Sequence, residues 1–151
     1  MILGYILEKV SGESVDMSVP FAAGALYSTV NDLYRWDEAL VTHTFASNAS
    51  LESMFAPQVS WCDGQGTPCS HSQCLAQQQN CTSYGYGWFI YQEQVRQRFV
   101  RLIEHGGDID GFVSSNRYYP DQKVILIILS NLETFNPHDI SDVVEAAFFS
   151  H

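Results

Sequence analysis

The sequence predicts an α+β fold, in which an antiparallel β-sheet has helices on its two sides. Segments typical of strands follow one another from residue 84 onward and are joined by short turns, which favours antiparallel pairing. Six consecutive apolar residues at 124–129 indicate a strand that is buried on both faces. Apolar residues also recur at helical spacing before residue 42 and after Pro137, so helices should flank the sheet.

The first expected helix covers residues 2–10, where apolar side chains recur at helical spacing and Gly12 follows as a stop. No residue that could cap the helix precedes it. We therefore expect the chain to begin inside an element that would start earlier in a longer protein.

The second expected helix runs from Thr29 through Leu40. Thr29 is a suitable N-cap, and Asp32 three residues later completes a pattern like a capping box. Tyr34 and Trp36 are expected to pack within the apolar stripe of this helix rather than to hold a cofactor. A further short helix is expected at residues 51–55.

Strands are expected at residues 88–95 and 99–105, which a hairpin would join, and at residues 112–119. A turn that begins at Pro120 leads into the apolar strand at 124–129. Because that strand is apolar on both faces, it is expected to be central in the sheet.

The last expected helix follows Pro137, with Asp139 as its cap. Its apolar residues fall at helical spacing, so this stripe should pack on the sheet. The stripe consists of Ile140, Val143, Val144, Ala147 and Phe148.

Composition suits one globular domain covering residues 1–151, because 46% of the residues are hydrophobic. The net charge is −10 with only 7 basic residues, which argues against nucleic acid as a partner. The longest apolar run is far shorter than the ~20 residues of a membrane-spanning helix, so no membrane span is expected.

A polar, Cys-rich loop is expected at residues 56–83, and it holds all 4 cysteines: Cys62, Cys69, Cys74 and Cys81. An even number of cysteines in one polar loop favours two disulfides, formed in an extracellular or periplasmic compartment. Three pairings remain open. The alternative is a zinc site with His71 as an extra ligand, but the spacing does not form the usual paired Cys-x₂₋₄-Cys pattern.

The candidate site is His105-Gly106-Gly107, which follows a strand-like run. Glycine beside a polar side chain at a strand edge lets a ligand or another backbone approach closely. The alternative is a hairpin whose glycines only serve the turn, and the spacing alone favours it. Glu104, Asp108 and Asp110 flank His105 and could raise its pKa, but we interpret them as turn residues.

Four segments in order resemble the C-terminal part of the serine β-lactamase-related hydrolases. That family includes penicillin-binding DD-peptidases, class C β-lactamases and β-lactamase-fold esterases. The segments are residues 3–12, 22–33, 84–88 and 101–131. The resemblance implies a sheet-containing half of that fold, with acyl transfer on β-lactam, D-Ala-D-Ala peptide or ester substrates as the family chemistry.

The family's chemistry depends on three motifs: Ser-x-x-Lys, Tyr-x-Asn or Ser-x-Asn, and Lys/His-x-Gly on a strand edge. His105-Gly106-Gly107 matches the third motif and would bind substrate and stabilise the oxyanion. The first motif is absent, because neither Lys9 nor Lys123 has a serine three residues earlier. No Tyr-x-Asn occurs, and the Ser-x-Asn at residues 114–116 falls where the family has an ordinary strand.

The leading hypothesis is therefore a truncated β-lactamase-related serine hydrolase that is inactive alone. It would take a small-molecule or peptide substrate only if a missing half completed the site, and no cofactor or metal is expected. The second hypothesis is a non-catalytic assembly module that forms a homo-oligomer or pairs with another chain. The third is a split enzyme whose Ser-x-x-Lys half is a separate polypeptide.

Overall fold

The computed structural model describes residues 28–62, 68–76, 81–95 and 98–149. In this part of the chain, seven strands form one antiparallel sheet in the order β2-β1-β3-β4-β5-β6-β7. The strands are β1 (Val59–Trp61), β2 (Pro68–Cys69), β3 (Cys81–Tyr84), β4 (Phe89–Val95), β5 (Arg98–Ile109), β6 (Phe112–Tyr119) and β7 (Val124–Ser130).

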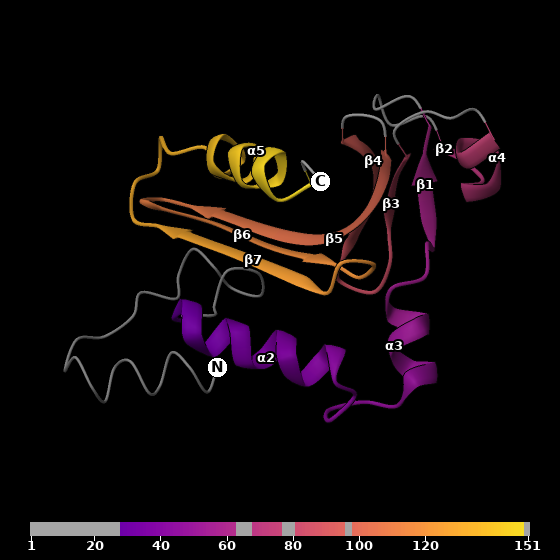
Figure 1. The fold of residues 1–151 in the computed structure, drawn as a ribbon, viewed down its shortest axis with the longest axis horizontal. Helices are drawn as coiled ribbons and strands as arrows, with labels where there is room; N and C mark the ends of the chain where they lie inside the picture. The colour runs from indigo at the N-terminus through magenta and orange to yellow at the C-terminus, as the bar shows by residue number, and fades with distance from the viewer. Residues whose placement is uncertain (1–27, 63–67, 77–80, 96–97, 150–151) are drawn as a thin grey trace.

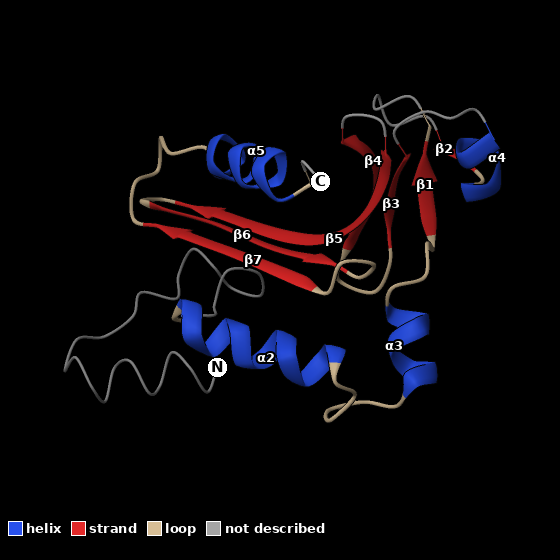
Figure 2. Cartoon of the chain, viewed as in Figure 1, coloured by secondary structure: helices blue, strands red, loops and turns tan. Residues whose placement is uncertain are grey.

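Four helices accompany the sheet: α2 (Val30–Val41), α3 (Asn48–Met54), α4 (His71–Ala76) and α5 (Pro137–Phe148). Helices α2 and α5 lie on opposite faces of the sheet, and α3 and α4 lie beside β1 and β2 (Figures 1 and 2). The predicted α+β class with an antiparallel sheet is confirmed. The helix expected at residues 2–10 lies outside the described residues.

Helix α2 begins as the sequence predicts. The Thr29 side chain accepts a hydrogen bond from the Asp32 backbone N–H at 3.2 Å, which satisfies one of the free donors of the first turn. The expected packing of Tyr34 and Trp36 is wrong, because these side chains are 48% and 45% exposed. The inward face of the helix instead buries Asp37, one position beyond Trp36.

Helix α3 starts three residues earlier than the sequence predicts, because Ser47 caps it by accepting from the Ser50 backbone N–H. The segment predicted as a Cys-rich loop contains β1, β2, α4 and β3. These elements are short and rich in Ser, Thr and Cys, so they carry no clear hydrophobic period.

One of the predicted disulfides is present and joins Cys62 to Cys69 across the β1–β2 hairpin. These two thiols are therefore not available to a zinc ion. Cys81 is buried and is also disulfide-bonded. The side chain of Cys74 lies outside the described part of the structure.

Strand β7 is at the edge of the sheet among the described residues, so the central position expected for 124–129 is wrong. Its apolar character has a different cause, because helices contact the strand from both sides. Helix α2 contacts β7 on one face, whereas Val124 and Leu126 pack on the other face with Tyr119 and Phe149. An apolar run of this kind therefore indicates that both faces of the strand are covered. It does not indicate that the strand has a neighbouring strand on each side.

Helix α5 differs from the sequence prediction in two ways. Asn136 is the N-cap, with its side chain accepting from the His138 backbone N–H, and Asp139 lies inside the first turn. Pro137 occupies the first helical position, where its missing N–H is no loss. The helix buries Pro137, Ser141 and Glu145, so the predicted packing of its apolar stripe on the sheet is wrong.

Candidate functional site

Strand β5 has a partner on one side only over its last residues. Its pairing with β4 ends at Phe89↔Glu104, whereas its pairing with β6 continues to Ile109↔Phe112. Within the described chain, residues 105–109 therefore have one free strand edge. Such an edge presents unpaired N–H and C=O groups to which another extended backbone can bind.

His105 lies on this edge and is exposed. Its Nδ1 is 2.7 Å from the carbonyl oxygen of Gly106, and because a carbonyl only accepts, Nδ1–H donates. Its Nε2 is 3.5 Å from the Tyr84 hydroxyl. The rings of Tyr84 and Phe89 lie 6.5 and 6.2 Å from the imidazole, centroid to centroid. The imidazole is thus oriented by its own strand through Nδ1, while its Nε2 has only a long contact with the Tyr84 hydroxyl.

The two glycines let β5 and β6 approach closely. A Cβ on Gly106 would lie 3.1 Å from the Ser114 carbonyl oxygen, and a Cβ on Gly107 would lie 2.9 Å from the Ser114 Oγ. Neither glycine is in the hairpin turn, which instead contains Gly111 with a φ of 82°. The hairpin interpretation, which the spacing alone favoured, is therefore wrong.

Glu104 lies directly before His105 and is buried, which corrects its interpretation as a turn residue. Its side chain points to the sheet face opposite to that of His105, because successive strand residues alternate. On that face the Ser115 Oγ donates to Glu104 Oε1 at 2.9 Å, and the Arg117 Nε lies 3.3 Å from the same oxygen. Asp108 belongs to β5 and is exposed.

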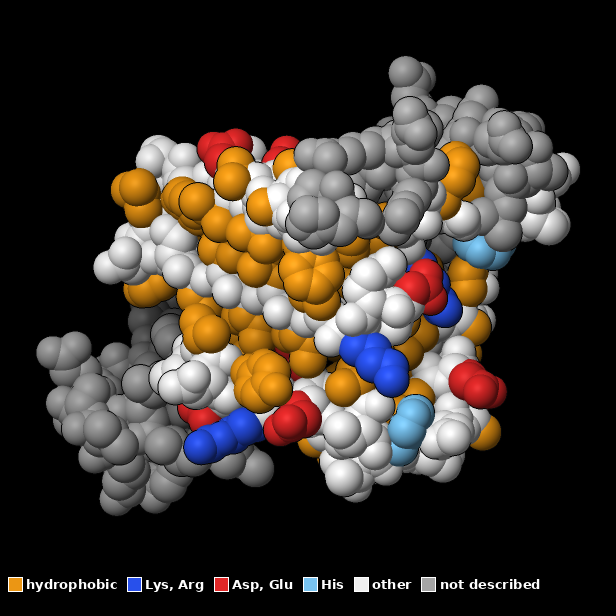
Figure 3. Space-filling view, in the orientation of Figure 1, with side chains coloured by type: hydrophobic (Ala, Val, Ile, Leu, Met, Phe, Trp, Pro, Cys, Tyr) orange, Lys and Arg blue, Asp and Glu red, His pale blue; other side chains and the backbone are white. Residues whose placement is uncertain are grey.

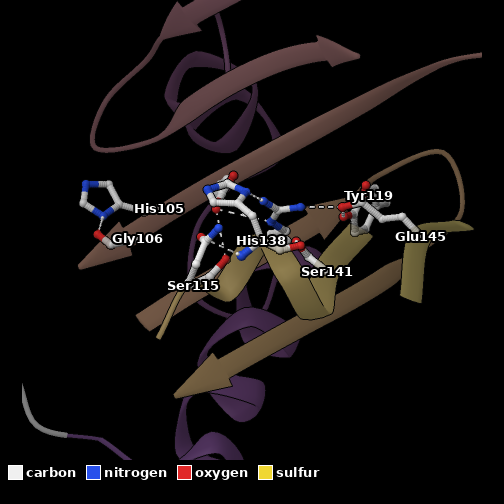
Figure 4. A network of polar contacts seen from close by, with 10 residues as sticks. His105, Gly106, Ser115, Tyr119, His138, Ser141 and Glu145 are labelled. Atoms are coloured by element: carbon white, nitrogen blue, oxygen red, sulfur yellow. Dashed lines mark hydrogen bonds and ion pairs between the residues drawn. The ribbon is translucent and has the colours of Figure 1, made fainter. Parts of the chain in front are cut away.

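Arg117 continues this network across the sheet to α5. Figure 4 labels Ser115, Tyr119, His138 and Glu145 among the residues of this region. Its Nη1 donates to Glu145, which also accepts from the Tyr119 hydroxyl. Its Nη2 lies 2.5 Å from His138 Nδ1, which must accept because a guanidinium only donates. Glu104, Arg117, Tyr119 and Glu145 thus form a buried network that joins β5, β6 and α5, and His138 contacts it from an exposed position.

The positive charge of Arg117 and the negative charges of Glu104 and Glu145 compensate one another within the buried network. Burial alone would lower the pKa of Arg117, but Glu104, Tyr119 and Glu145 together raise it above its ordinary value. Burial raises the pKa of Tyr119, and its hydrogen bond to Glu145 raises it further, so this hydroxyl stays a donor. Removing one charge from such a network leaves the others buried and unpaired.

The described residues contain no nucleophile beside a lysine base. Ser114, Ser115 and Asn116 lie in β6 opposite Gly107, Gly106 and His105, so the Ser-x-Asn is part of an ordinary strand, as expected. Ser115 is buried, and Lys123 lies in the turn before β7. No group of three or more metal-ligating side chains occurs in the described ranges.

Sequence reasoning missed Arg117 as the partner of both Glu104 and Glu145. A charged residue at an inward position of a strand is uncommon, so the alternation of Ser115, Arg117 and Tyr119 was an available signal. The signal does not identify the partner, because Glu145 lies 28 residues away.

Comparison with known proteins gives two findings. The sequence model of the Beta-lactamase family matches residues 12–148. Penicillin-binding protein 4* of Bacillus subtilis (strain 168) is 31% identical over 110 residues, which is 73% of this chain and 20% of that protein. The chain therefore spans about a fifth of the length of this relative. No helix in the described ranges is both long and apolar enough to cross a membrane.

Replacing Arg117 with Met should lower the free energy of unfolding by about 3–5 kcal/mol, because Glu104 and Glu145 would stay buried without their cation. The matched control is Arg35→Met, which removes an exposed pair with Asp32 at 3.6 Å and should cost about 0.5 kcal/mol or less. Urea unfolding measures both values. Equal losses in the two variants would contradict the role given to Arg117.

Replacing Gly107 with Ala should cost about 1 kcal/mol or more, because the new Cβ meets the Ser114 Oγ. The loss should shrink when Ser114 is also replaced with Ala. Gly106→Ala is the matched comparison, and its loss should persist in the Ser114→Ala background because its neighbour is a backbone oxygen. Thermal unfolding of the single and double variants tests this, and the same rescue for both glycines would contradict the packing described.

Proposed function

Because this chain belongs to the Beta-lactamase family, we propose that the free edge of β5 at residues 105–109 binds the acyl part of a substrate. His105-Gly106-Gly107 would serve as the strand-edge motif that family members use to hold a substrate carbonyl. Substrates of the corresponding class are β-lactams, peptides that end in D-Ala-D-Ala, and esters. The backbone edge would bind the extended acyl chain, and His105 Nε2, which is an acceptor while Nδ1–H donates to Gly106, would accept a hydrogen bond from a donor group of the substrate.

A single observation carries this proposal, namely that β4 leaves β5 at Glu104 while β6 stays paired to Ile109. The side of β5 that β4 vacates is next to the exposed imidazole. Glu104 and the rest of the buried network support the strand from behind, so the edge is ordered before a ligand arrives.

The chain carries no Ser-x-x-Lys, because its two lysines, Lys9 and Lys123, have Ile6 and Pro120 three residues earlier. Acylation in this family needs a serine whose proton a lysine and a tyrosine manage. We therefore propose that the chain by itself does not turn substrate over, and that its β5 edge holds the acyl group only where another polypeptide supplies the serine and the lysine.

The Cys62–Cys69 disulfide supports an extracellular or periplasmic location, because such bonds persist where thiols are oxidised.

Incubating the purified chain with a chromogenic β-lactam, a nitrophenyl ester and a fluorophosphonate should give no turnover above that of buffer. Mass spectrometry after the incubation should find no serine adduct, since no serine of this chain has a lysine three residues later. An active family enzyme under the same conditions is the positive control. Sustained turnover that proceeds through a serine adduct would overturn the proposal of an inactive chain.

A second candidate function is a non-catalytic assembly module, and the outer face of α5 favours it. That face exposes large apolar side chains, with Val143 at 67%. Hydrophobic side chains form a band over α5 and the strands beside it in Figure 3. The exposed residues of the α5 face are Ile140, Val143, Val144 and Phe148. Apolar surface of this extent commonly marks an interface with another polypeptide.

Light scattering over a range of protein concentrations tests this candidate. The chain should self-associate as its concentration rises, and Val143→Glu should shift it to monomers because a carboxylate would be buried in the contact. Gln122→Glu adds the same charge at an exposed turn and should change nothing. A monomer at every concentration would count against self-association through α5.

A further inference from the structure

Helix α2 and strand β6 meet through one buried polar contact on the sheet face that carries His105. The Asn116 Nδ2 donates to Asp37 Oδ1 at 3.1 Å, between residues 79 positions apart. Asp37 is only 3% exposed, and in the described chain it has no ion pair. A carboxylate that is removed from water in this way loses its hydration without gaining a cation.

Among the described residues, the second oxygen of each side chain in this contact has no hydrogen-bond partner. These are Asp37 Oδ2 and Asn116 Oδ1, and both are buried. If the carboxyl group were ionised, both atoms would be acceptors, and no donor would serve either of them. Two unsatisfied buried acceptors on the two partners of one hydrogen bond are costly, whereas a single proton shared by the pair would satisfy both.

The surroundings favour a proton as that donor over a water molecule. A cavity of about 10 Å³ adjoins Asp37, which is at the lower limit for one water. Its other walls are mostly apolar, with Leu40, Phe55 and Trp88 among them, so a water would find few partners there.

We propose that the folded protein holds Asp37 as a neutral carboxylic acid whose Oδ2–H donates to Asn116 Oδ1. The acid and the amide then share two parallel hydrogen bonds, with Asn116 Nδ2–H donating back to Asp37 Oδ1. One proton thereby satisfies both orphaned atoms. The pair fastens α2 to β6 directly across from His105, because Asn116 is the register partner of His105. Asp37 and Asn116 are in this sense positioning residues for the strand edge.

The electrostatics agree with this assignment. Burial raises the pKa of Asp37, and the hydrogen bond from Asn116 only partly offsets it. In the part of the chain that the structure describes, the titratable groups around the pair are Tyr118, which lines the same cavity, and His105 on β5. Strand β7, which α2 also contacts, carries no titratable side chain.

The sign of the pH dependence follows from the protons bound. An unfolded aspartate ionises near pH 3.9, whereas the folded protein keeps the proton on Asp37 at higher pH. Between these two values the native state binds more protons, so stability falls as pH rises. The stabilisation of the folded state by the pair is therefore fully present below about pH 4. It declines as the pH rises from there to the raised pKa of Asp37.

The decisive variant is Asp37→Asn, because an amide at this position can make both hydrogen bonds with Asn116 without a titrating proton. Its urea midpoint at pH 7 should equal or exceed that of the parent chain, and the fall in midpoint above pH 4 should become smaller. Asp142→Asn makes the same chemical change at an exposed position of α5 and should leave that fall unaltered. A lower midpoint for Asp37→Asn at pH 7 would overturn the proposal and indicate an ionised carboxylate with a bound water or cation.

A direct measurement complements the variant. The carboxyl carbon resonance of Asp37, identified by its absence in Asp37→Asn, should not titrate near pH 4, whereas that of an exposed aspartate should. A titration of Asp37 at the ordinary value would also overturn the proposal. Neither experiment measures turnover or ligand binding, so their failure would leave the function proposed for the β5 edge untouched.

Discussion

The buried guanidinium of Arg117 is the constraint on which the arrangement of this molecule depends. This guanidinium lies between Glu104 on β5 and Glu145 on α5, and Arg117 itself belongs to β6. Opposite charges that are removed from water must stay in contact, because separating them would leave each without compensation. Apolar packing is not directional and would leave the positions of β5, β6 and α5 less closely defined. The specific contacts of the Arg117 side chain therefore set these positions.

Two features that matter for function follow from this contact. The first is the rotation of α5: because Glu145 and Ser141 must face the sheet, Val143 and its apolar neighbours face outward. The second is the position of the free edge of β5, since Glu104 is anchored one residue before His105. The apolar face and the candidate binding edge are thus consequences of the same ionic network.

The sequence predicted the elements whose signals are local. The Thr29 cap and the run at 112–119 depend on neighbouring residues, and they are found where expected. The failures concern long-range contacts. The stripe of α5 has the period of a packed helix, but a buried Glu145 outweighs it because an unpaired charge costs more than an exposed valine. The glycines beside His105 resembled a turn because the distance to β6 cannot be read from the sequence.

The central claim is that the buried network holds the candidate binding edge in place. Native-state amide hydrogen exchange in Glu145→Gln, a change that keeps the side-chain shape and removes one charge, tests it most directly. Amides of residues 105–109 that bond to β6 should exchange faster than in the parent chain, while amides of β3 should keep their rates. Unchanged exchange at residues 105–109 in a folded variant would contradict the claim.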